Sequence, residues 1–126
     1  MPYPEQLEPG TTVKLMVVED HDLVREGLVT LLSSQPDMEV VGEAGSVRDA
    51  IALANRLQPD LILMDYSLPD GKGDEATRLI LASLPETKIV FLTVHDDDAR
   101  LFAALAAGAR GYVRKNVRAA DLLHRL

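Results

Sequence analysis

Five short apolar segments alternate along the chain with segments whose apolar residues recur at helical spacing. The run at 61–64, Leu-Ile-Leu-Met, is apolar at every position, as in a strand covered on both faces. A helix between successive strands favours parallel pairing, so the sequence predicts an α/β fold with helices on both faces of one sheet. The predicted strands cover residues 13–18, 38–41, 61–64, 89–92 and 111–113.

The predicted helices lie between these strands. Ser46 is a predicted N-cap, because a serine hydroxyl can accept a hydrogen bond from the first turn of a helix. Prolines at 36, 59 and 85 end the segments that precede them. The helical patterns cover residues 23–32, 46–57, 76–84, 101–105 and 122–126.

Length and composition favour one domain. The chain has 126 residues, of which 47% are hydrophobic, enough for a core of its own. Residues 1–12 carry three prolines in the first nine positions and are predicted to be a flexible leader, with the folded domain over 13–126. The chain lacks cysteine and any apolar run of about 18 residues, so no disulfide frame or membrane span is expected. A cytoplasmic location is therefore expected, and the net charge of −7 opposes direct binding to nucleic acid.

Charged or hydroxyl side chains follow four of the five predicted strands. They are Glu19 and Asp20, Asp65, Thr93 and Lys115. The carboxyl ends of parallel strands share one edge of a sheet, where ligands bind in such folds. Three carboxylates at one edge would repel one another, and a hard cation such as Mg²⁺ would remove that repulsion. Lys115 could pair with a carboxylate or a phosphoryl group, and Thr93 could donate a hydrogen bond to an anion.

Simpler interpretations of these residues exist. Glu19 and Asp20 could be an acidic helix start, which the helix dipole favours, and Asp65 could cap a loop. His21 and His95 are not expected to bind Mg²⁺, which prefers oxygen ligands. The acidic start interpretation weakens once all the strand ends are considered together.

The order and spacing of these residues resemble response-regulator receiver domains of two-component signalling. The resemblance covers nearly the whole of 13–126 and implies a doubly wound, flavodoxin-like (βα)₅ fold with a parallel five-stranded sheet in the order 2-1-3-4-5. It rests on Glu19-Asp20, on Asp65 at the end of an apolar strand, on Leu68-Pro69-Asp70-Gly71-Lys72-Gly73, on Thr93, and on Lys115 after Gly111-Tyr112-Val113-Arg114.

The resemblance implies a role for each site residue. Asp65 would accept a phosphoryl group from a sensor histidine kinase. Mg²⁺, or Mn²⁺, would be held by Glu19, Asp20, Asp65 and the backbone carbonyl of Ser67. Lys115 and Thr93 would contact the phosphoryl oxygens.

A second set of residues would transmit or time the signal. The resemblance implies that Thr93 moves toward the phosphoryl group and draws Tyr112 from an exposed into a buried rotamer. Ser67 and His95, two residues after Asp65 and Thr93, would tune the lifetime of the phosphoryl group.

Further details resemble the NarL/FixJ-type subgroup, whose members carry a C-terminal LuxR-type helix-turn-helix. Such a domain would bind DNA as the transcriptional output, and it is absent from this chain. The last helix is expected to be truncated at Leu126. Phosphorylation-dependent homodimerisation is a further implication. Two departures from the family pattern are Val94, where alanine is frequent, and Asn116, where proline is frequent, so a cis peptide bond before residue 116 is not expected.

Two other functions fit parts of the sequence. A stand-alone receiver acting in a phosphorelay would carry the same site without an output domain. A haloacid-dehalogenase-type phosphatase would use Asp20 as nucleophile and Asp22 as acid/base, with Gly73-Asp74 as its later acidic motif. The late position of Lys115 opposes the phosphatase, because the lysine of that superfamily precedes the acidic motif.

Overall fold

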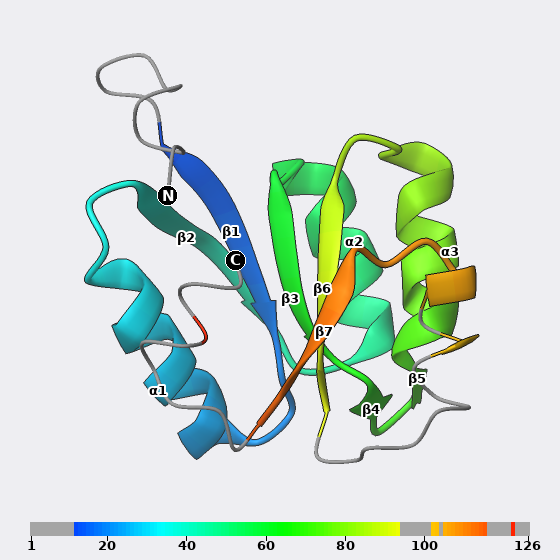
Figure 1. Cartoon of the computed structure of the whole chain (residues 1–126), viewed down its shortest axis with the longest axis horizontal. Coiled ribbons are helices and arrows are strands. Elements are labelled where there is room, and N and C mark those ends of the chain that lie inside the picture. The colour runs from blue at the N-terminus through cyan, green and yellow to red at the C-terminus, as the bar shows by residue number, and fades with distance from the viewer. Residues whose placement is uncertain (1–11, 94–101, 104, 116–121, 123–126) are drawn as a thin grey trace.

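A parallel sheet of five strands forms the centre of the computed structural model (Figure 1). The structure describes residues 12–93, 102, 103, 105–115 and 122. Counted along the chain, the strands of the sheet lie in the order 2-1-3-4-5, so the predicted fold class and strand order are confirmed. The strands, in their order across the sheet, are β2 (Met38–Ala44), β1 (Val13–Val18), β3 (Leu61–Asp65), β6 (Lys88–Thr93) and β7 (Gly111–Arg114).

Helices cover both faces of this sheet (Figure 1). Successive residues of a strand point to opposite faces, so each strand supplies both layers. Met16 and Ile62 pack toward α2 (Val47–Leu57) and α3 (Gly73–Ser83), in a core that includes Ala50 and Ile80. The alternate residues of the same strands, Leu15 and Leu63 among them, pack toward Leu32 of α1 (Asp22–Ser33). This two-sided burial explains why β3 is apolar along 61–64.

A short two-stranded hairpin follows β3, and the sequence pattern did not predict it. Its strands are β4 (Ser67–Leu68) and β5 (Gly71–Lys72), and α3 begins directly after them. Gly73 is required there, because a Cβ at this position would collide with the Phe91 ring and lie 3.0 Å from the carbonyl oxygen of Asp65. The Gly73 N–H donates to the carbonyl of Tyr66 at 2.7 Å, which fixes the loop that follows Asp65.

The start of α2 is capped from two directions. Ser46 accepts a hydrogen bond from the Asp49 N–H at 3.1 Å, which confirms the predicted N-cap. Asp70, in the β4–β5 turn, accepts from the N–H groups of Val47 at 2.7 Å and Arg48 at 3.0 Å. These hydrogen bonds lower the pKa of the Asp70 carboxyl and tie the loop after Asp65 to α2.

Several predictions fall on residues outside the described part of the chain. They include residues 1–11 of the predicted leader, Val94, His95, Asn116 and most of the last helix. None of the described helices has the length and apolar character needed to cross a bilayer.

Candidate functional site

The carboxyl ends of the strands lie at the lower edge of the sheet in Figure 1. The residues at or directly after these ends include Glu19, Asp20, Asp65, Thr93 and Lys115. Two backbone hydrogen bonds extend the strands to these residues. The Glu19 N–H donates to Ala44 at 2.9 Å, and the Lys115 N–H donates to Thr93 at 2.8 Å. The convergence expected from parallel strands is therefore present.

Three of these side chains form a buried ionic group. The Lys115 ammonium Nζ lies 2.6 Å from Glu19 Oε1 and donates to Asp65 Oδ2 at 3.0 Å. Asp65 is only 4% exposed and Glu19 is fully buried. The backbone N–H of Ser67 donates to Asp65 Oδ1 at 3.2 Å, so both oxygens of the Asp65 carboxylate are oriented.

The surroundings shift the pKa values of these groups in opposite directions. Burial raises the pKa of Asp65 to about 6, and the negative charge of Glu19 adds to the rise, against hydrogen bonds from Lys115 and the Ser67 N–H. Burial alone would also raise the pKa of Glu19, but hydrogen bonds from Lys115 and His21 outweigh it and lower that pKa to about 2. Burial would lower the pKa of Lys115, but Glu19 and Asp65 together raise it. The structure therefore carries excess negative charge here.

The geometry suits a divalent cation. Glu19, Asp20, His21 and Asp65 each place one ligand atom within 4.8 Å of the others. Asp20 Oδ1 is shielded from solvent and, among the described residues, accepts no hydrogen bond, although His21 Nδ1 lies 3.3 Å from it. An oxygen in this state needs a cation or a donor, and carboxylate oxygens are the ligands that Mg²⁺ takes. Glu19, Asp20 and Asp65 together form the acidic cluster.

The remaining predicted residues lie near the acidic cluster or on its strands. Thr93 is buried at the end of β6, and Ser67 is exposed in β4. Tyr112 is half-buried in β7 and packs against the core beneath α2 and α3. Their roles in switching and in phosphoryl lifetime stay predictions, as does the role of His95, which lies outside the described residues.

Sequence reasoning did not identify Arg25, although its side chain supports the acidic cluster. Its guanidinium donates to the backbone carbonyl of Glu19 at 2.9 Å, to Asp22 at 2.7 Å and to Glu43 at 3.3 Å. This side chain therefore joins the ends of β1 and β2 to the first turn of α1. An arginine one turn into the helix after an acidic strand end is the signal that could have revealed it.

The phosphatase alternative requires Asp22 to act beside Asp20. Instead, the Asp22 side chain is 80% exposed and accepts from Arg25. Asp22 is also outside the group of residues whose ligand atoms converge. The Asp22 carboxylate therefore pairs with Arg25 and is not part of the group that contains Asp20.

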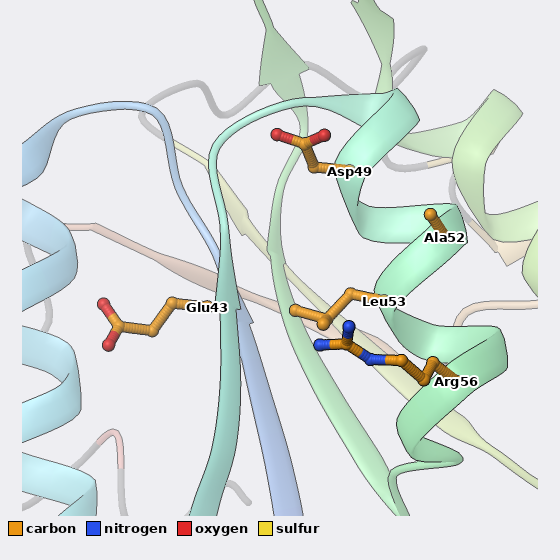
Figure 2. Close-up of a pocket in the computed structure, with 5 residues that line it drawn as sticks. All are labelled: Glu43, Asp49, Ala52, Leu53 and Arg56. Carbon is orange, nitrogen blue, oxygen red and sulfur yellow. The ribbon is translucent and has the colours of Figure 1, made fainter.

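A separate cavity of about 370 Å³ lies between β2 and α2 and is lined by Glu43, Asp49, Ala52, Leu53 and Arg56 (Figure 2). Leu53 and Arg56 reach from α2 toward β2, whereas the Glu43 carboxylate points away from α2 (Figure 2). The charged groups of this cavity do not converge, so it is a weaker candidate than the acidic cluster.

The raised pKa of Asp65 predicts a stability effect in metal-free protein. Between about pH 4 and 6, folded Asp65 keeps a proton that the unfolded chain has lost, so ionising it costs stability as the pH rises. Asp65→Asn removes that cost and should stabilise the protein by about 1–3 kcal/mol at pH 7.5, with the gain shrinking below pH 5. Urea unfolding in the presence of a chelator, at pH 7.5 and again below pH 5, measures this change in the free energy of unfolding.

The matched control for this stability prediction is Glu86→Gln, which removes one charge from an exposed side chain. The unfolding free energy of Glu86→Gln should differ little from that of the parent chain at either pH value. A destabilised Asp65→Asn variant at pH 7.5 would show that the pairing with Lys115 outweighs the burial of the carboxylate.

Comparison with known proteins finds many that are similar in sequence to this chain. Residues 15–126 match the family described as the response regulator receiver domain. The chain is 43% identical over 110 residues to the DNA-binding transcriptional activator DevR/DosR of Mycobacterium tuberculosis, covering 87% of this chain and 51% of that protein. It is 45% identical over 111 residues to the response regulator VraR of Staphylococcus aureus, covering 88% and 53%. The chain thus spans about half the length of these curated relatives.

Solved structures of response regulators have the same fold as this chain. A LuxR-family response regulator from Aurantimonas sp. SI85-9A1 superposes with a TM-score of 0.86 at 38% identity, covering 90% of this chain and 81% of that one. The receiver domain of the putative response regulator NarL from Mycobacterium tuberculosis gives a TM-score of 0.86 at 32% identity, covering 91% and 93%.

Proposed function

The chain belongs to the response-regulator receiver family. We propose that it is a phosphorylation-dependent switch whose phosphoacceptor is Asp65. The observation that carries the proposal is the setting of the Asp65 carboxylate. It is buried at the sheet edge, oriented by Lys115 and the Ser67 N–H, and adjacent to Glu19 and Asp20. Glu19 is also buried beside Lys115, but its second oxygen accepts from the backbone N–H of His21 and not from that of Ser67.

The proposed reaction is transfer of a phosphoryl group to one Asp65 oxygen. That oxygen forms a bond to phosphorus while the bond from phosphorus to the donor breaks, and the leaving group keeps the electron pair. Lys115 Nζ, 3.0 Å from Asp65 Oδ2, is placed to pair with a phosphoryl oxygen as it gains charge. Thr93 is proposed to donate a hydrogen bond to another phosphoryl oxygen.

The cation that completes this site is proposed to be Mg²⁺ or Mn²⁺. Glu19, Asp20, Asp65 and the backbone carbonyl of Ser67 would hold it. Mg²⁺, when bound, neutralises the carboxylates and the incoming phosphoryl oxygens. The shielded Asp20 Oδ1 and the excess negative charge support this assignment.

The partners follow from the family. The proposed phosphodonor is a sensor histidine kinase. Thr93 and Tyr112 are proposed to change position after the transfer. Ser67 and His95 are proposed to tune the lifetime of the phosphoryl group. One relative carries DNA-binding transcriptional activation in its name. The proposed output is therefore transcriptional, through a helix-turn-helix domain outside this chain, with homodimerisation on phosphorylation.

Two further proposals complete this function. The protein works in the cytoplasm, where the kinase domains that phosphorylate such receivers act. It is not an enzyme in the ordinary sense, because the group that it accepts stays on its own side chain. A stand-alone receiver remains the alternative, and the gene sequence after Leu126 decides between them.

Intact-protein mass spectrometry tests the proposed function. Incubation with acetyl phosphate and Mg²⁺ should add the mass of one phosphoryl group, and chelation of Mg²⁺ should prevent the addition. Absence of any added mass with Mg²⁺ present, in protein that is folded by circular dichroism, would count against the proposal.

A further inference from the structure

We propose that His21 is a ligand for a transition-metal cation of borderline softness, such as Ni²⁺, Co²⁺ or Zn²⁺, in the site formed with Glu19 and Asp20. The site would then favour these cations over Mg²⁺ more strongly than a carboxylate site does. The inference rests on the proposed metal site but not on phosphoryl transfer.

The distances around His21 match those between neighbouring metal ligands. Its ring nitrogen Nδ1 lies 3.0 Å from Glu19 Oε2, to which it donates a hydrogen bond, and 3.3 Å from Asp20 Oδ1. On metal binding the Nδ1 proton would leave to solvent and the nitrogen lone pair would bind the cation. Neighbouring ligands of a four- to six-coordinate cation with bonds of about 2.0–2.2 Å lie about 3.0–3.5 Å apart. The three atoms therefore have the spacing of one side of a coordination shell.

The backbone holds His21 at this position. It is the N-cap residue of α1 in extended conformation, and its ring makes no capping hydrogen bond with the described part of the helix. The His21 N–H donates to Glu19 Oε2 at 3.1 Å, and the His21 carbonyl accepts from the Arg25 N–H at 2.9 Å. The ring is thus free of a structural role in the helix, while the main chain on both sides is fixed.

The Lys115 ammonium does not compete with this arrangement. Lys115 approaches Glu19 Oε1 at 2.6 Å, whereas His21 approaches the other oxygen, Oε2, at 3.0 Å. The His21 side chain is 67% exposed, so a hydrated cation can reach it from solvent. A cation on the Oε2 side would leave the pairing of Lys115 with Glu19 and Asp65 in place.

The ligand preferences of the cations would make binding at His21 selective for transition metals over Mg²⁺. Imidazole nitrogen suits Ni²⁺, Co²⁺ and Zn²⁺, whereas Mg²⁺ takes oxygen ligands and keeps much of its water. Removing the imidazole should therefore weaken binding of the first group and leave Mg²⁺ binding little changed. A residue that only oriented Glu19 would affect both groups alike.

Calorimetric titration of tag-free, metal-free chain with NiCl₂ and, separately, MgCl₂ tests the proposal. His21→Ala should weaken Ni²⁺ binding at least about tenfold and change Mg²⁺ binding less than about twofold. His124→Ala, which removes a histidine distant in sequence, is the control and should change neither. Equal weakening for both cations, or an unchanged Ni²⁺ affinity, overturns the proposal.

A second measurement needs no variant. In proton NMR spectra, substoichiometric Ni²⁺ should broaden the His21 ring resonances before those of the other two histidines. Broadening of the others first, with His21 unaffected, overturns the proposal. Mg²⁺-dependent phosphoryl uptake by the same preparation reports separately on the proposed function, so either can fail alone.

Discussion

Asp65→Asn is expected to abolish phosphoryl uptake from acetyl phosphate in the presence of Mg²⁺. The amide retains the size of the side chain but lacks the carboxylate oxygen that would form the bond to phosphorus. The buried setting, with Lys115 at 3.0 Å and the Ser67 N–H at 3.2 Å, singles out this carboxylate. Intact-mass spectra should show no phosphorylated species after a time that saturates the parent chain.

Asp60→Asn is the matched control for Asp65→Asn. Asp60 stands at the opposite end of β3, where its exposed carboxylate accepts from the Lys14 N–H at 2.9 Å. This variant should take up phosphoryl groups at the parental rate. Acid-labile phosphate retained by folded Asp65→Asn would refute the assignment of the phosphoacceptor.

The second large effect is expected on Mg²⁺ affinity. Asp20→Ala removes a carboxylate whose Oδ1 is shielded from solvent and accepts no hydrogen bond from the described residues. Mg²⁺ binding should weaken at least about tenfold, because hard cations depend on a small number of carboxylate ligands. Calorimetric titration with MgCl₂ measures the change directly, independently of any phosphoryl donor.

Asp22→Ala serves as the control for the Mg²⁺ prediction. Asp22 is two residues away and carries the same charge, but its exposed carboxylate pairs with Arg25 instead of joining the acidic cluster. Its removal should change Mg²⁺ affinity by less than about threefold, through the net charge alone. Equal effects of the two substitutions would mean that the cation is attracted by the charge of the segment and is not held at Asp20.

The position of Glu19 shows how the site balances its charges. Both carboxylate oxygens are engaged, Oε1 by Lys115 and Oε2 by the backbone and ring of His21. These contacts keep Glu19 ionised, while the pKa of Asp65 rises to about 6. A cation added beside Asp65 would offset its unfavourable ionisation, which would couple metal binding to the availability of the proposed nucleophile.

The sequence predicted the parts of the fold that depend on regular periodicity. The apolar run at 61–64 became β3, and the side chains after the strands met at one edge, because parallel strands all end there. Strand order was not available from periodicity, which does not say which strands are neighbours. It came from the resemblance of motifs such as Leu68–Gly73.

The parts that sequence reasoning missed depend on single long-range contacts. The Asp70 carboxylate caps α2 across 23 positions of chain, and the Arg25 guanidinium joins three elements. Neither contact leaves a repeating pattern. The hairpin of β4 and β5 is also too short, at two residues a strand, to show alternation.

Locating the phosphorylated residue distinguishes Asp65 from Asp20 as the phosphoacceptor. The chain is incubated with acetyl phosphate and Mg²⁺, the acyl phosphate is reduced with borohydride, and the reduced residue is identified by peptide sequencing. We expect position 65 alone to be converted to homoserine. Conversion at Asp20, with Asp65 intact, would contradict this expectation and restore the phosphatase alternative.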